Sequence, residues 1–124
     1  MPFVRSSDTT LYEIHGTRFH AYAHSGSGAS QLAAWITEVP VGTPGTPHTV
    51  DREEILRIAG GRVRVVLNGD SADLEPGDVA IVPAGSELRV DNLGPEPAIM
   101  WATTSIGLAA TMADGSTLNP PWAN

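Results

Sequence analysis

The stretch GTPGTPHTVDREEILRIAGG, residues 42–61, decides the fold of this chain. Five residues separate its first Gly from His48, and six residues separate Glu54 from its last Gly. The two Gly and two Pro residues ahead of His48 disfavour a helix and predict a rigid loop. From Glu54 to Ile58 the chain is predicted to resume as a strand. Gly60 and Gly61 then predict a two-residue hairpin turn into the next strand.

A second stretch, GDVAIVPAGSELRVDN at residues 77–92, has a similar frame. Its first Gly stands five residues before a Pro-x-Gly turn at residues 83–85, and it closes with Asn92. Together the two stretches resemble the two motifs of the cupin family. The first family motif consists of Gly, His-x-His, Glu and Gly, and the second consists of Gly, Pro-x-Gly, His and Asn. The resemblance spans residues 32–104. It implies an all-β fold, a single cupin β-barrel of the double-stranded jelly-roll type.

The chain departs from the cupin motifs at two histidine positions, which are Val50 and Leu88 here. In the family, three imidazoles and one carboxylate around one point of the inner face hold a transition metal. Of that set only His48 and Glu54 remain, and two protein ligands make a weak metal site. We therefore expect no metal cofactor. If a metal binds, His48 and Glu54 are the expected ligands.

Length and composition favour one small β domain. The chain has 124 residues, no internal repeat, and 13 Gly and 10 Pro, which suit short strands joined by tight turns. We expect a single cupin domain over residues 1–124. It is divided into a core at residues 32–104, an N-terminal strand segment at residues 1–31 and a C-terminal tail at residues 105–124.

The charge balance excludes two classes of partner. Fourteen acidic against seven basic side chains give a net charge of −7, which repels nucleic acid and anionic membrane surfaces. The absence of Cys is compatible with a reducing compartment, and no signal peptide or membrane span is predicted, so the expected location is the cytoplasm. Cupins commonly pair through exposed strand edges, so the resemblance implies a homodimer.

Alternating patterns and turn residues predict the other strands. Asn68-Gly69 is the strongest hairpin signal in the chain. The predicted strands are Arg18–His24, Gln31–Val39, 62–67, Ser71–Leu74, Val79–Val82, Leu88–Asp91 and Ala98–Thr104.

Three histidines near the N-terminus are interpreted as surface or packing residues, dispensable for any activity. His20 and His24 lie four apart on a predicted strand, about 13 Å at roughly 3.3 Å per residue, so they cannot hold one ion. His15 precedes this strand.

His48 and Glu54 allow two interpretations. In an apolar barrel, desolvation lowers the pKa of an imidazole and a neighbouring carboxylate raises it, so the pair can act as acid and base near neutral pH. Alternatively, the two side chains are a buried hydrogen-bonded pair without a catalytic role.

Alternation in residues 31–39 places Trp35 and Thr37 inward, because Glu38 on the other face prefers water. The predicted pocket is walled by apolar side chains with one amide, and its small-molecule ligand is expected to contact Trp35, Thr37, Val50, Leu56, Leu88, Asn92 and Trp101.

Three classes of function remain open. The first is a small-molecule enzyme that uses His48 and Glu54 and has no redox metal. It would be an isomerase, cyclase, epimerase or lyase of the kind found in bacterial secondary metabolism. The second is a non-catalytic cupin that binds a small ligand. The third is a metal-dependent enzyme or dioxygenase with an atypical site. The fold by itself does not choose among them.

Overall fold

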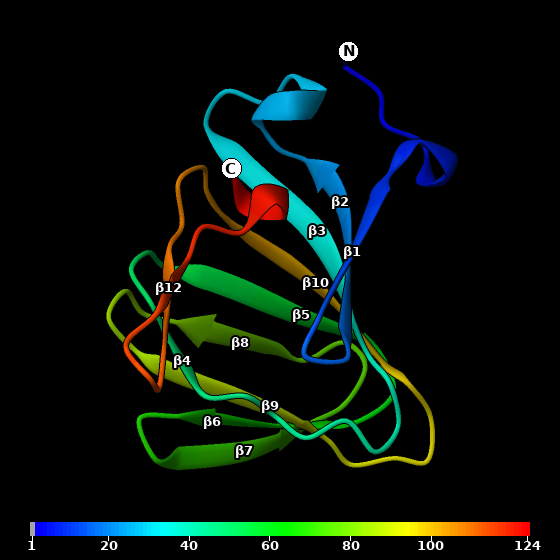
Figure 1. Ribbon diagram of the computed structural model, residues 1–124. Coiled ribbons are helices and arrows are strands. Elements are labelled where there is room, and N and C mark those ends of the chain that lie inside the picture. The colour runs from blue at the N-terminus through cyan, green and yellow to red at the C-terminus, as the bar shows by residue number, and fades with distance from the viewer. Residues whose placement is uncertain (1) are drawn as a thin grey trace.

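The computed structural model describes residues 2–124 and confirms the all-β expectation. Two six-stranded sheets face each other, with strand orders β1-β2-β3-β10-β5-β8 and β12-β11-β4-β9-β6-β7 (Figure 1). All pairings are antiparallel. The strands are β1 (Thr10–Ile14), β2 (Thr17–Ala23), β3 (Leu32–Val39), β4 (His48–Val50), β5 (Glu54–Gly60), β6 (Val63–Leu67), β7 (Asp70–Leu74), β8 (Val79–Val82), β9 (Glu87–Asn92), β10 (Ala98–Ser105), β11 (Ala110–Met112) and β12 (Thr117–Leu118). Short 3-10 turns lie at η1 (Ser6–Asp8), η2 (Ser25–Ser27) and η3 (Pro121–Ala123).

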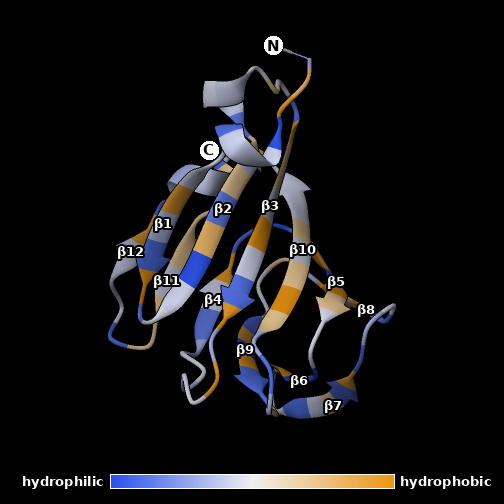
Figure 2. Cartoon of the chain, turned by 90° about the vertical axis from the view of Figure 1, so that its right-hand side faces the viewer, coloured by the Kyte–Doolittle hydropathy of each residue, from blue (hydrophilic) through white to orange (hydrophobic). Residues whose placement is uncertain are grey.

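The core lies between the two sheets and follows the alternation of the strands. Ile58 and Met100 are fully buried on the inner face of the first sheet, and Val50 and Val63 on that of the second. Bands of hydrophobic and hydrophilic residues alternate along β2 (Figure 2). Because successive side chains of a strand point to opposite faces, one apolar set per strand is enough to build this core.

One predicted hairpin is confirmed and another is wrong. Asn68 and Gly69 have φ values of 51° and 88° and join β6 to β7, as expected of a type I′ turn. Gly60 and Gly61 do not form a hairpin, since β5 pairs with β10 and β8 while β6 pairs with β7 and β9. At Gly61 the chain crosses between sheets, and a Cβ there would lie 2.7 Å from the carbonyl oxygen of Pro97. The close approach of the Pro97 backbone, rather than a hairpin turn, explains why a glycine stands at position 61.

The packed core extends beyond residues 32–104. Ala21 of β2 belongs to it, and so do Leu108 and Trp122 of the tail. The tail contributes β11, which pairs with β4. Segments at both ends of the sequence therefore widen the sheets and help to close the space between them. Among residues 2–124, no helix has the length and apolarity that a membrane crossing requires.

Candidate functional site

A cavity of about 130 Å³ lies between the two sheets. Its wall combines inward side chains of both sheets with residues of the C-terminal tail, and most of them are apolar. Five of the predicted wall residues line it: Trp35, Thr37, Val50, Leu56 and Leu88. His48 and Glu54 line it too, so all four positions that correspond to metal ligands in the resemblance meet at one cavity.

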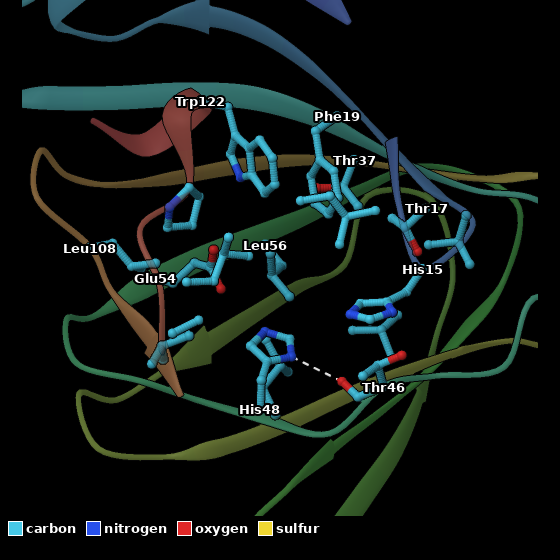
Figure 3. A pocket seen from close by; sticks show the side chains of 18 of the residues that line it. His15, Thr17, Phe19, Thr37, Thr46, His48, Glu54, Leu56, Leu108 and Trp122 are labelled. Atoms are coloured by element: carbon cyan, nitrogen blue, oxygen red, sulfur yellow. Dashed lines mark hydrogen bonds between the residues drawn. The ribbon is translucent and has the colours of Figure 1, made fainter. Parts of the chain in front are cut away.

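His48 is held at the start of β4 by the proline-containing loop before it. Its Nδ1 atom lies 2.9 Å from the carbonyl oxygen of Thr46 (Figure 3). A carbonyl oxygen only accepts hydrogen bonds, so Nδ1 carries the proton in the neutral ring and Nε2 has a free lone pair. The backbone therefore orients the imidazole and sets its tautomer, as the partner of a catalytic histidine does.

Glu54 starts β5 and faces inward with Leu56 and Ile58, and it is 5% exposed. Burial raises the pKa of Glu54 to about 7, and burial is the only cause of the shift. No hydrogen bond or charge from residues 2–124 therefore offsets the cost of ionising this carboxyl group. It titrates where a general acid or base works best.

His48 and Glu54 come from opposite sheets and face the same space (Figure 3). The imidazole makes its hydrogen bond to Thr46, and no bond joins it to Glu54 in the described part of the chain. A buried hydrogen-bonded pair, the alternative interpretation from the sequence, is therefore not what the structure contains. Both groups are available to a molecule in the cavity.

The side chains at this point do not fit the four-ligand metal centre that the resemblance implies. Val50 and Leu88 offer no donor atoms, and Leu88 lies directly beside His48 in the β4–β9 register. Within residues 2–124, no group of three or more His, Cys, Asp or Glu is placed to hold a metal ion.

Two predicted wall residues lie elsewhere. Trp101 is on the outer face of β10, tilted against Tyr22 at a centroid distance of 4.8 Å, because Met100 takes the inward position next to it. The Asn92 side chain is hydrogen-bonded to the backbone. Its Nδ2 donates to Val39 O at 3.0 Å and to Glu96 O at 2.9 Å. These contacts hold the turn after β9 and leave no amide for a ligand.

One histidine that the sequence analysis set aside lies at the cavity. His15 lines it, in the two-residue turn between β1 and β2 (Figure 3). His15 and Gly16 have φ values of 52° and 81°, the conformation in which Asn-Gly forms type I′ hairpins. The His-Gly pair is the feature of the sequence that could have predicted this turn. His20 instead lies on the outer face, with Nε2 at 3.2 Å from Glu38.

Other wall residues were missed because they lie outside the motif stretches. They come from β2 and the tail, and include Phe19, Leu108 and Trp122. Apolar residues at strand spacing give no signal that separates the lining of a cavity from ordinary core.

Comparisons with known proteins agree with this architecture. A family model described as a cupin domain matches residues 35–106. No curated protein sequence matches the chain.

Solved structures with the same fold include three small proteins. An RmlC-like cupin from Shewanella frigidimarina is 20% identical with a TM-score of 0.73, and the match covers 85% of this chain and 90% of that one. The polyketide cyclase RemF from Streptomyces resistomycificus is 18% identical with a TM-score of 0.74, over 85% and 79% of the two chains. KdgF from Halomonas sp. is 22% identical with a TM-score of 0.71, over 84% and 93%. At these identities the likeness shows the fold alone.

Proposed function

This chain belongs to the cupin family, and from that premise we propose that it is a small-molecule enzyme in which His48 and Glu54 perform acid–base catalysis without a redox metal. The reaction class is an isomerisation, cyclisation, epimerisation or elimination, because an acid and a base can promote each of these without an oxidant or a reductant. The name of RemF, a polyketide cyclase, supports the view that the fold can host such chemistry.

The observation that carries the proposal is the environment of Glu54. A carboxyl group with its pKa raised to about 7 by burial, facing an oriented imidazole across an apolar cavity, costs stability, and among residues 2–124 no hydrogen bond to its side chain offsets that cost. Groups of this kind are typical of sites that transfer protons near neutral pH.

The proposed step is an enolisation. Nε2 of His48 accepts a proton from a carbon next to a ligand carbonyl group, while the neutral carboxyl group of Glu54 donates its proton to the carbonyl oxygen. The products are a neutral enol, an imidazolium and a carboxylate, and the two charges stabilise each other in the apolar surroundings. If the ligand has a β,γ double bond, the enol is a conjugated dienol, and return of the imidazolium proton to its γ carbon, with the enol proton going back to Glu54, completes an isomerisation.

Glu54→Gln is expected to slow this chemistry about 100-fold or more, because an amide keeps the shape of the side chain but cannot transfer the proton. The substrate is unidentified, so the probe is cyclohexanone in D₂O, with exchange of its α-protons followed by NMR. In the unchanged protein the rate should fall as the pH rises through about 7, since ionisation removes the proton that Glu54 donates.

Glu53→Gln is the matched control, since Glu53 is the exposed neighbour of Glu54 in the sequence. It should exchange the probe at the rate of the unchanged protein. Equal rates for both variants would place the chemistry elsewhere. Binding of cyclohexanone without any exchange above the buffer rate would instead indicate a cupin that binds a ligand without catalysis.

We also propose that the protein is a homodimer. Val79 and Ile81 are 49% and 60% exposed on the outer face of β8, which is an edge strand. Ile55 pairs with Ile81 and faces the same way. Exposed apolar side chains along an unpaired edge favour association.

Light scattering should give twice the chain mass of 13.0 kDa, and Ile81→Arg should lower the measured mass to that of one chain. A mass near 13.0 kDa for the unchanged protein at micromolar concentration would disprove the dimer.

A further inference from the structure

One part of the cavity wall comes from η3, the last 3-10 turn of the chain. Trp122 of η3 is 3% exposed and lines the cavity together with Pro120. Its indole points into the cavity on the side opposite His48 (Figure 3). The space available to a ligand is therefore bounded by His48 on one side and by this indole on the other, with Glu54 on the wall between them (Figure 3).

Trp122 belongs to a small aromatic cluster. Its ring is stacked on Phe19 of β2, with a centroid distance of 3.9 Å and an interplanar angle of 6°. Tyr12 of β1 is tilted against it at 5.7 Å. Such pairs add stability beyond the area that they bury, so the indole is a fixed wall.

The backbone around Trp122 is held without being part of either sheet. The N–H of Gly107 donates to Ala123 O at 3.1 Å. Nδ2 of Asn124 donates to Leu108 O at 3.1 Å and to Pro120 O at 2.8 Å. These bonds involve no atom of the indole, so the side chain can be shortened while the turn and both sheets keep their hydrogen bonds.

The size of the remaining space limits the ligand. An apolar cavity of about 150 Å³ accommodates a benzene-sized molecule, and this cavity measures about 130 Å³. A molecule with two fused rings is larger than this volume, and removal of the Trp122 indole would enlarge the space. His48 and Glu54 supply polar atoms on the wall of the same cavity.

We propose that Trp122 is the residue that determines specificity for ligand size, and that it restricts the cavity to molecules with a single ring carrying a carbonyl or hydroxyl group. The inference rests on the proposed function in so far as this cavity is the ligand site. It does not depend on the acid–base step.

The test compares the affinities of phenol and 2-naphthol, measured by NMR titration, in the unchanged protein and in Trp122→Ala. The unchanged protein should bind phenol more tightly. In the variant, the ratio of the two affinities should shift toward 2-naphthol by about 100-fold, because the second ring fills apolar space that the indole has left. Trp101→Ala is the matched control, since Trp101 lies outside the cavity wall. It should leave the ratio unchanged.

Trp122→Leu provides a milder enlargement if the Ala variant does not fold, and it should shift the ratio in the same direction. An unchanged ratio in the folded variants, or an equal shift in Trp101→Ala, would overturn the inference, as would failure of both probes to bind. Glu54→Gln should keep the size preference of the unchanged protein. If proton exchange is absent while the size preference is present, only the proposed catalysis fails. If proton exchange is present while the size preference is absent, only the role of Trp122 fails.

Discussion

Glu54→Gln is expected to stabilise the folded protein by about 3 kcal/mol at pH 9 and to change its stability little at pH 4. The pKa of Glu54 rises from its usual 4.5 to about 7 on folding, because burial disfavours the charged form. Between these values the folded state binds more protons than the unfolded state, so stability falls as the pH rises from 4.5 to about 7. Gln has no proton to lose and removes this dependence.

The measurement is urea unfolding followed by tryptophan fluorescence at several pH values between 4 and 9. The difference between variants isolates the contribution of one group, because all other titrating residues are shared. Glu53→Gln should follow the unchanged protein, since its side chain is exposed. If Glu54→Gln and Glu53→Gln had the same stability difference at every pH, the Glu54 carboxyl group would be solvated, and the argument for its catalytic role would fail with it.

The double change Val50→His with Leu88→His is expected to create a metal site where the unchanged protein holds well under one transition-metal ion per chain. Val50 and His48 are two apart on β4, and Leu88 is the register partner of His48 on β9. Glu54 faces the same cavity from the opposite sheet. Three imidazoles and a carboxylate at one point form a donor set suited to Zn²⁺, Ni²⁺ or Fe²⁺.

Elemental analysis after dialysis against Zn²⁺ or Ni²⁺ should therefore find about one ion per chain of the double variant, and the ion should raise its melting temperature. Each single variant should bind more weakly, and adding Glu54→Gln to the pair should weaken binding again. Cyclohexanone exchange should not increase, because the proposed acid and base are then occupied as ligands. Stoichiometric metal in the unchanged protein, bound through His48 and Glu54, would contradict the prediction.

The sequence by itself determined the frame of the fold. Gly and Pro at motif spacing, period-two alternation and the Asn68-Gly69 turn are local signals, because backbone conformation and the face of a strand depend on near neighbours. For the same reason Trp35 and Thr37 were placed on the inner face, whereas the family resemblance placed Leu56 there, and the structure finds all three on the cavity wall. Val50 and Leu88 already predicted that a four-ligand metal centre would be incomplete.

The tertiary structure alone decided which sheet each strand joins and what closes the cavity. Gly60-Gly61 has the local form of a hairpin, yet the next strand enters the other sheet, because pairing depends on partners distant in the sequence. His15 and Trp122 are more than 30 residues and more than 60 residues from Glu54, respectively, and only folding brings them to its cavity. The raised pKa of Glu54 has the same origin. It is produced by apolar side chains from both sheets that exclude water from one carboxyl group, and no stretch of sequence contains that environment.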